Sequence, residues 1–212
     1  MILLASQSSG RLATLRAAGV EPLVRVSDVD EHAVLRVLAA DSRQEPTPVQ
    51  QVQALARAKA EEVAAAVTRA EREADPSLVV VGCDSMLEID GRVVGKPGTS
   101  EIARARWRSM RGRTGVLHSG HALVRVHDGA EAQGVSSTTV RFGSPADVEI
   151  DAYVATGEPL GCAGAFTIDG LGGAFIDGID GDPHGVVGIS LPLLRRLLAE
   201  LDVTWTDLWT RT

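Results

Sequence analysis

Lysine is the scarcest charged residue of the chain, which holds two lysines, Lys59 and Lys96, against nineteen arginines. The two cations are not interchangeable, because lysine carries a compact, strongly hydrated charge on a flexible stem and arginine carries a planar fork of donors. Composition leaves two explanations open: a codon bias that spared two lysines by chance, or two positions that require an ammonium. The surroundings of each lysine therefore have to decide between them.

Other absences exclude whole classes of protein. Two cysteines, Cys83 and Cys162, give no disulfide framework and no metal-binding spacing, which favours reduced thiols in a cytoplasmic protein. No run approaches the roughly 20 apolar residues of a membrane helix, and the N-terminus lacks the basic region of a signal peptide. The net charge of −7 argues against a general nucleic-acid binder. We therefore expect neither a membrane nor a nucleic-acid partner.

The chain does have the composition of an ordinary globular protein, with 44% hydrophobic and 23% charged residues among 212. Residues 1–212 predict a single α/β domain, large enough to form two lobes. The apolar run Leu78–Cys83 predicts a strand covered on both faces, and Asp90-Gly91 predicts the type I′ turn of a hairpin. Because hairpins accompany this strand, we expect a mixed sheet. Further strands are expected at 2–5, 23–27, 116–126 and 135–142, and helices at about 9–18, 49–74, 100–112, 144–157 and 190–201.

Two segments carry more local signals. Residues 157–188 contain ten of the 22 glycines, which is typical of turns and close backbone approach and not of helices. Ser144-Pro145-Ala146-Asp147 is typical of a helix start, with a serine cap, proline at the first position and an acid closing the capping box.

Lys59 occupies an unusual place on the helix expected over 49–74. It lies in the middle of an apolar stripe with helical spacing, formed by Val52, Leu55, Ala56, Val63 and Val67. A buried, unpaired ammonium is strongly unfavourable, so this side chain has to extend to solvent, form a salt bridge or bind an anion. The sequence leaves a structural salt bridge and an anionic ligand both open.

Asp84 follows the buried strand 78–83, where the carboxyl ends of strands gather ligands in open α/β sheets. A carboxylate there can act as a metal ligand or a general base, or it can cap a turn. Lys96 lies in a Gly-Lys-Pro turn that fails the P-loop pattern, since no Ser or Thr follows it and no helix begins there. Lys96 follows a glycine as the P-loop lysine does, so we retain only the expectation that it lies near a phosphate.

Two further groups of residues suit anions. The opening segment 4–11 predicts a strand, a hydroxyl-rich turn and a helix with Arg11 in its first turn, a geometry that binds phosphates. A basic run on the helix expected over 100–112 is either a solvated face or a surface for an anionic ligand; it consists of Arg104, Arg106, Arg108, Arg111 and Arg113. These cations, hydroxyl groups and carboxylates together favour binding and hydrolysis of a phosphate compound without a covalent nucleophile.

Taken together, these segments resemble the Maf family of nucleoside triphosphate pyrophosphatases, and the match runs nearly from end to end. The matching motifs are Leu4-Ala5-Ser6-x-Ser8-x-x-Arg11, Asp30-Glu31, Ala56-Arg57-x-Lys59-Ala60, Gly82-x-Asp84, Gly95-Lys96-Pro97, Tyr153-Val154, Glu158-Pro159, Ala163-Gly164-Ala165-Phe166, Gly170-Leu171-Gly172-Gly173 and Val186-Val187-Gly188. The resemblance implies a central mixed sheet with a cleft, similar to inosine triphosphate pyrophosphatases. It also implies hydrolysis of a nucleoside triphosphate to the monophosphate and pyrophosphate in a house-cleaning role, with Mg²⁺ or Mn²⁺, and it is compatible with a homodimer.

The resemblance also assigns roles to residues. Asp84 matches the proton acceptor, and Glu31 and Asp84 are the expected metal ligands. The expected substrate-binding residues are Ser6, Ser8, Arg11, Lys59 and Lys96. An alternative role that the family suggests is a nucleotide-binding regulator of cell division, an inhibitor of septum formation with little or no catalysis.

Three positions depart from the family's pattern and bear on base selection. Gly10 replaces the first arginine of a common Ser-Pro-Arg-Arg. Ser85 stands where one branch, which prefers dTTP and UTP, has Thr, and where a branch that prefers 7-methyl-GTP has Gln. Asp169 stands where those branches have Gln or Glu. Because Ser resembles Thr, we expect a preference for pyrimidine or modified pyrimidine triphosphates.

Overall fold

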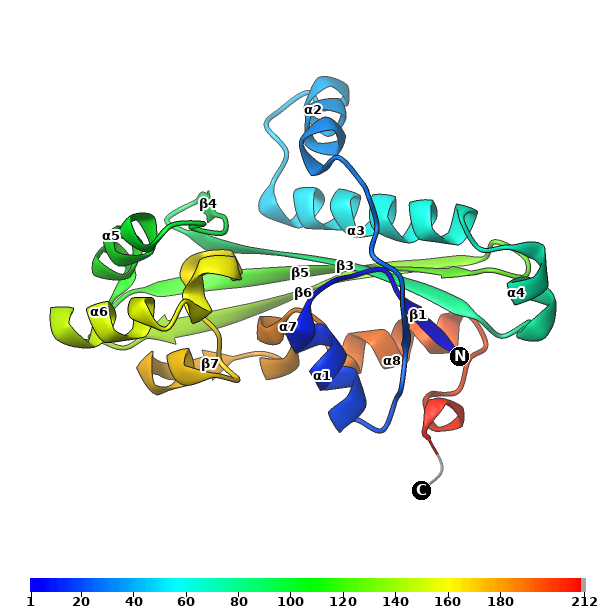
Figure 1. Cartoon of the computed structure of the whole chain (residues 1–212). Helices are drawn as coiled ribbons and strands as arrows, with labels where there is room; N and C mark the ends of the chain where they lie inside the picture. Colours follow the sequence, from blue (N-terminus) through cyan, green and yellow to red (C-terminus); the bar gives the residue numbers. More distant parts are fainter. Residues whose placement is uncertain (211–212) are drawn as a thin grey trace. The chain divides into compact units, whose positions relative to one another are not determined.

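The structure is a computed structural model, and it describes residues 1–210 (Figure 1). Seven strands of this range form one mixed sheet in the order β2-β1-β3-β5-β6-β7, with β4 paired to β3. The strands are β1 (Ile2–Leu4), β2 (Leu23–Val24), β3 (Val79–Ile89), β4 (Arg92–Val94), β5 (Thr114–Arg125), β6 (Glu131–Phe142) and β7 (Ile176–Asp180). The sheet confirms the predicted α/β class, since β1 is parallel to β2 and β3 whereas the pairs β3–β4 and β6–β7 are antiparallel.

Eight α-helices and four short 3₁₀ segments of residues 1–210 accompany the sheet. The helices are α1 (Ser9–Ala17), α2 (Glu31–Asp41), α3 (Pro48–Ala65), α4 (Arg69–Ala74), α5 (Ser100–Met110), α6 (Asp147–Ala155), α7 (Pro183–Val187) and α8 (Leu191–Glu200). The 3₁₀ segments are η1 (Glu158–Gly161), η2 (Ala163–Ala165), η3 (Leu171–Phe175) and η4 (Trp205–Leu208). No helix within residues 1–210 is long and apolar enough to cross a membrane.

The chain divides into two compact units. Unit one comprises Met1–Asp84, Ser119–Ser136 and the chain from Gly188 onward, and unit two comprises Ser85–His118 and Ser137–Val187. The strands β3, β5 and β6 each contribute residues to both units. The boundary in β3 falls directly after Asp84.

Unit one is a sheet covered by helices on both faces. In Figure 1, α3 lies over one face, and α1 and α8 lie under the other. Successive residues of β3 alternate between the two cores, because Val80 packs with α3 whereas Val79 and Val81 pack with α1 and α8. This burial confirms the prediction of a strand covered on both sides. The leucines of α8 and of its C-cap belong to the same core as Val79 and Val81; they are Leu193, Leu194, Leu197, Leu198 and Leu201.

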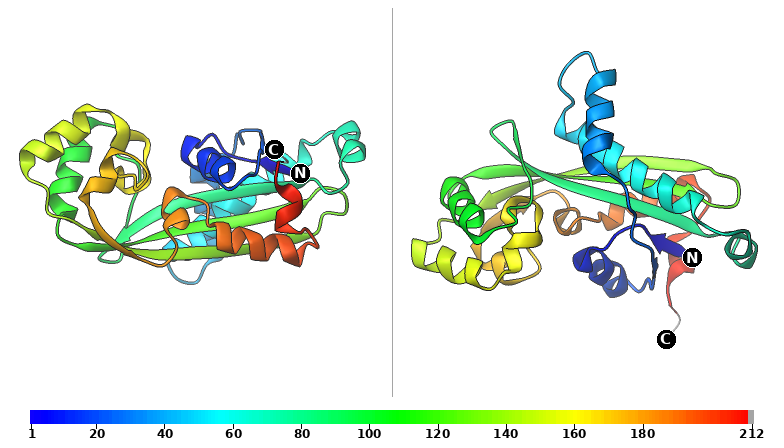
Figure 2. Two further views of the ribbon diagram at one scale, coloured as in Figure 1. Left: turned by 90° about the horizontal axis from the view of Figure 1, so that it is seen from below. Right: turned by 45° about the horizontal axis from the view of Figure 1, so that its top comes forward.

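Unit two has an aromatic core. The fully buried Trp107 of α5 meets Phe142, Tyr153 and Phe175 edge to face, with ring centroids 5.7–6.0 Å apart. Its indole Nε1 donates a hydrogen bond of 2.7 Å to the carbonyl oxygen of Ala165. Helices α5 (green) and α6 (yellow-green) lie side by side over this core (Figure 2).

Local capping sets several helix ends differently from the sequence expectation. The single helix expected over 49–74 is wrong, because Thr68 begins a new helix, α4, in a capping box with Glu71. The start expected at Ser144 is also wrong: the cap is Ala146, whose N–H donates to the Glu149 carboxylate at 2.7 Å. The predicted hairpin is confirmed, since Asp90 and Gly91 have φ of 50° and 73° and join the antiparallel strands β3 and β4.

The helices α2 and α7, the four 3₁₀ segments and the strand β7 were not expected. The prediction that the glycine-rich segment 157–188 forms turns and no helices is wrong, because α7 and the 3₁₀ segments η1, η2 and η3 lie within it. Helix α2 begins at its cap Asp30, whose carboxylate accepts a 2.9 Å hydrogen bond from the N–H of Ala33, and it contains no buried residue. Strand β7 lies in the glycine-rich segment 157–188 and owes its conformation to pairing with β6. Strand β7 lacks the periodic apolar pattern on which the expectation depends, whereas α2 carries Val34, Leu35 and Leu38 at helical spacing, a signal that the expectation overlooked.

Candidate active site

A glycine brings the central lysine of α3 to the end of β3. A Cβ atom at Gly82 would lie 2.2 Å from the carbonyl oxygen of Ala56 and 2.7 Å from the backbone nitrogen of Ala60. Only a residue without a side chain permits this approach of strand to helix. A Cβ at Gly120, on β5, would likewise lie 2.4 Å from the carbonyl oxygen of Val52. These contacts seat α3 close on the sheet, so that Lys59 meets the residue two positions after Gly82.

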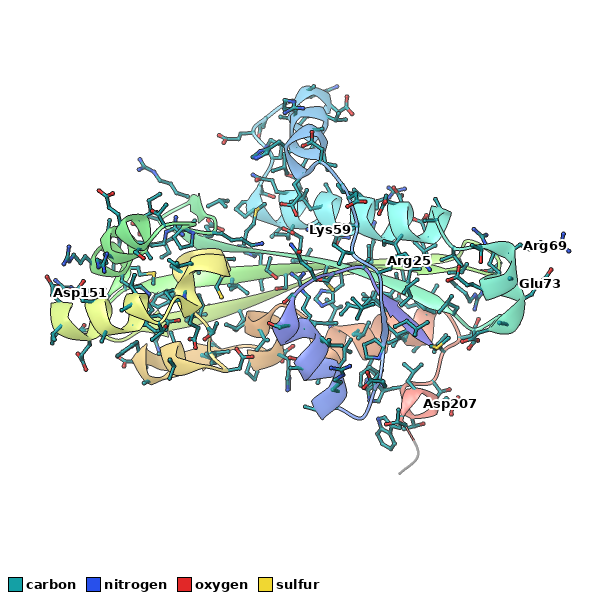
Figure 3. All side chains as sticks on the ribbon, viewed as in Figure 1. Arg25, Lys59, Arg69, Glu73, Asp151 and Asp207 are labelled. Atoms are coloured by element: carbon teal, nitrogen blue, oxygen red, sulfur yellow. The ribbon has the colours of Figure 1, made fainter. Side chains whose placement is uncertain are left out.

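Lys59 forms two short ion pairs. Its Nζ lies 2.6 Å from Oδ1 of Asp84 and 2.6 Å from Oε1 of Glu31. Lys59 and Asp84 are nearly buried, with side chains 12% and 13% exposed, whereas Glu31 in the first turn of α2 is 52% exposed. Figure 3 shows Lys59 beneath α3, on the side that faces the sheet. The salt bridge left open by the sequence is therefore present, and its partners are the two carboxylates predicted to be functional.

Arg11 is held by two segments of unit one. Its Nη1 donates to Oγ of the buried Ser6 at 3.0 Å, and its Nε donates to the carbonyl oxygen of Gly188 at 2.9 Å. Ser8 caps α1, since its Oγ accepts a hydrogen bond from the Arg11 N–H at 3.3 Å, and its own N–H donates to Ser6 Oγ at 3.2 Å. The opening motif thus folds into one network that fixes the guanidinium.

The electrostatics of Cys83 show that these groups share one neighbourhood. Burial raises the pKa of the Cys83 thiol to about 11; Arg11 acts against that rise, Asp84 adds to it and Lys59 again opposes it. Arg11, Lys59 and Asp84 therefore all influence the thiol of one buried residue. The structure therefore brings together six of the predicted site residues in unit one: Ser6, Ser8, Arg11, Glu31, Lys59 and Asp84.

His121 supports this network and was missed at the sequence level. Its Nε2 accepts a 2.9 Å hydrogen bond from the N–H of Ser190, so the proton lies on Nδ1, which donates to the carbonyl oxygen of Ser119 at 3.0 Å. The imidazole is fully buried. It fixes the segment whose Gly188 carbonyl binds Arg11. A histidine inside a buried strand was the only signal in the sequence, and it does not reveal its partners.

The other four predicted site residues are Gly10 in unit one and Ser85, Lys96 and Asp169 in unit two. Gly10 lies in the first turn of α1 and contributes no side chain there. In unit two, Ser85 is half-buried in β3, and Lys96 and Asp169 are exposed. Lys96 has no carboxylate at ion-pair distance among residues 1–210. Burial raises the pKa of the Cys162 thiol; Glu158 and Asp169 add to the rise and Lys96 opposes it.

Glu158 organises the loop that carries Asp169. Its carboxylate accepts hydrogen bonds from Oγ1 of Thr167 at 2.7 Å and from the N–H groups of Leu171 and Gly172 at 3.0 Å each. Burial acts to raise the pKa of Glu158, but these donors outweigh it, so the pKa lies below its usual value. The family motif Glu158-Pro159 does not by itself reveal this hydrogen bonding, because the partners of Glu158 lie in a separate segment.

The carboxylates fit a divalent cation that also binds substrate. No cluster of three or more potential metal-binding side chains occurs within residues 1–210. Glu31 and Asp84 nevertheless converge on one ammonium, and two carboxylates against one ammonium leave the cluster net negative. Mg²⁺ is commonly held by one or two carboxylates together with substrate phosphates instead of by an all-protein cage. The donor set therefore suits Mg²⁺ or Mn²⁺ carried with a phosphate ligand.

Comparisons with known proteins agree with this chemistry. Residues 1–201 match the family model described as Maf-like protein. A relative from Mycobacterium sp. (strain JLS) is 54% identical over 99% of this chain and 98% of its own length. A relative from Rhodococcus jostii (strain RHA1) is 54% identical over 97% and 94%, and one from Saccharopolyspora erythraea is 56% identical over 97% and 95%. All three relatives carry the name nucleoside triphosphate pyrophosphatase.

Proposed function

The chain belongs to the Maf-like protein family, and we propose that it hydrolyses a nucleoside triphosphate to the monophosphate and pyrophosphate. Relatives at 54–56% identity over nearly their whole length carry the name of that activity. The observation in the structure that supports it most is the Glu31–Lys59–Asp84 cluster, which joins a near-buried carboxylate to a cation at the end of a strand.

Asp84 is the proposed general base. Its Oδ1 is fixed by Lys59 at 2.6 Å, and its side chain is 13% exposed, so one oxygen is oriented while solvent still reaches the group. It accepts the proton of the water that attacks the α-phosphorus. Glu31 and Asp84 are the residues that would hold a divalent cation, which would supply charge neutralisation of the phosphates and a more acidic bound water.

Arg11 and Lys59 are the proposed cations for the phosphates. Negative charge builds up on the leaving pyrophosphate, and donors fixed in advance stabilise it without reorganisation. Arg11 is fixed by Ser6 and Gly188, and Lys59 by two carboxylates. Lys96 is a further substrate-binding residue in this proposal.

The proposed substrates are pyrimidine or modified pyrimidine triphosphates, in a house-cleaning role that removes them from the nucleotide pool. This preference depends on Ser85 and its resemblance to threonine, with Gly10 and Asp169 as the other two positions that bear on the base. The small side chains at positions 10 and 85 leave base selection to shape more than to charge.

A panel of nucleoside triphosphates, assayed with Mg²⁺ and with Mn²⁺, tests the proposal. We expect monophosphate and pyrophosphate as products; release of orthophosphate would exclude the assigned bond. Asp84→Asn should abolish turnover and preserve nucleotide binding, because the amide keeps the shape of the side chain but cannot accept the proton. Nucleotide-dependent thermal stabilisation of the unmodified protein without any product would instead favour a binding regulator. A sizing column on the same preparation tests the predicted homodimer.

A further inference from the structure

Four of the five arginines in the basic run are neutralised by carboxylates within unit two. Arg104 pairs with Asp151 at 2.8 Å, and Arg113 pairs with Asp90. Arg108 and Arg111 share a third carboxylate, Asp147, at 3.3 Å and 2.7 Å. For these four residues the solvated face is the better of the two interpretations that the sequence left open.

Arg106 is the exception. No carboxylate among residues 1–210 lies at ion-pair distance from it, and its guanidinium is half-buried on α5. Burial without a counter-charge lowers the pKa of Arg106, in contrast to the arginines that have acidic partners. A partly desolvated cation without an acidic partner is unfavourable in isolation, and an anion from solution would relieve it.

The contact that Arg106 does make connects it to Lys96. Its Nη1 donates to the carbonyl oxygen of Gly95, the residue before Lys96. The same carbonyl accepts a 3.3 Å hydrogen bond from the N–H of Gly164, and the N–H of Gly98 donates to the carbonyl oxygen of Leu160 at 3.2 Å. The turn that carries Lys96 is therefore held from both ends, and a second cation stands beside it.

Among residues 1–210, the Nε and Nη2 groups of Arg106 make no hydrogen bond. These two groups form one edge of the guanidinium fork, the edge that binds two phosphate oxygens at once. Lys96, which follows the Gly95 that Arg106 binds, supplies a point charge of the kind that also binds phosphate. Both features suit a diphosphate better than a single carboxylate.

We propose that Arg106 binds a phosphate group directly and forms, with Lys96, a diphosphate-binding subsite in unit two. The chemical class of the ligand follows from the proposed function, in which pyrophosphate is a product and part of the substrate. The four neutralised arginines lie outside this subsite.

Calorimetric titration of the full chain with inorganic pyrophosphate tests the subsite. Arg106→Gln removes the charge and keeps a donor for the Gly95 carbonyl; it should weaken pyrophosphate binding about 10- to 100-fold, the expected loss of a charge-assisted, two-point contact. Arg108→Gln is the matched control, with the same change of charge on the same helix, and should leave the affinity unchanged. Equal affinities for the two variants would overturn the proposal.

A second comparison separates binding from positioning. In a Lys96→Ala background, Arg106→Gln should weaken pyrophosphate binding further, because Arg106 contacts the phosphate itself. If its effect disappears in that background, Arg106 only holds the turn and the proposal is wrong. Activity assays on the same proteins distinguish the proposed subsite from the proposed hydrolysis. If the unmodified chain binds pyrophosphate through Arg106 but cleaves no triphosphate, the proposed hydrolysis is refuted and the subsite is not.

Discussion

Gly82→Ala should disable the proposed active centre through one methyl group. The added Cβ would lie 2.2 Å from the Ala56 carbonyl oxygen and 2.7 Å from the Ala60 nitrogen, both of them backbone atoms that no side-chain rotation can move. Restoring ordinary contact requires α3 and β3 to separate by about 1 Å, which for a packed core costs about 1–3 kcal/mol of unfolding free energy. Gly82 has no positive φ, so the cost is steric and not conformational.

The same displacement acts on catalysis. Lys59 and Asp84 lie on the two elements that separate, and their 2.6 Å contact would lengthen by a comparable amount. A misplacement of about 1 Å at a reacting group can lower the rate about 100-fold. We therefore expect kcat for the preferred triphosphate to fall about 100-fold in Gly82→Ala, together with a lower midpoint of urea unfolding.

Gly161→Ala provides the control. No heavy atom lies within 4 Å of a Cβ built at Gly161, and its φ is not positive, so stability should change by less than about 0.5 kcal/mol and kcat should stay unchanged. A Gly82→Ala variant with wild-type kcat and wild-type stability would refute the argument that this glycine sets the distance between strand and helix.

Three further changes have distinct expected outcomes. Lys59→Arg should lose most activity and lower the unfolding free energy by about 1–3 kcal/mol in urea unfolding, because the larger planar fork has to replace a single Nζ between two carboxylates in a nearly buried place, and wild-type activity would contradict this reason. Glu158→Gln should lower the unfolding free energy by about 1–3 kcal/mol, since two backbone N–H groups then compete for one acceptor oxygen, and wild-type stability would contradict this role. Glu71, whose pKa is lowered from 4.5 to about 2, first by the Thr68 N–H, should stabilise the protein above pH 4.5 and lose that effect as the pH falls through 2; the stability gap to Glu71→Gln should accordingly close in acid.

Elements with a strong local signal could be predicted from the sequence, and elements defined by their partners could not. The apolar run 78–83, the Asp90-Gly91 turn and the leucine face of α8 each carry their own pattern. Strand β7 carries none and exists because it pairs with β6. Helix α2 is an exception: it carries Val34, Leu35 and Leu38 at helical spacing after the cap Asp30, so its signal is present in the sequence although none of its residues is buried. The break between α3 and α4 depends on the capping box at Thr68, which competes locally with an otherwise continuous helical pattern.

In the candidate site, too, local patterns could be predicted from the sequence and contacts with distant segments could not. The position of Lys59 on an apolar stripe already requires a partner, but which carboxylates supply it depends on the close contact of Gly82 with α3 and on the course of the chain before α2. His121 and Glu158 act through backbone groups of distant segments, Ser190 in one case and Leu171 with Gly172 in the other. A backbone donor has no signature in the sequence, so such supporting residues emerge only with the tertiary structure.

The two lysines are explained to different degrees. At Lys59 one nitrogen lies 2.6 Å from two carboxylates of different elements in a side chain that is 12% exposed, a place that suits a compact charge. Lys96 is exposed and has no carboxylate at ion-pair distance within residues 1–210, so nothing around it excludes a larger guanidinium. If steric fit is the reason for lysine, Lys96→Arg should keep most of the activity that Lys59→Arg loses. Equal losses at both positions would show that the ammonium itself, and not the space around it, is required at each.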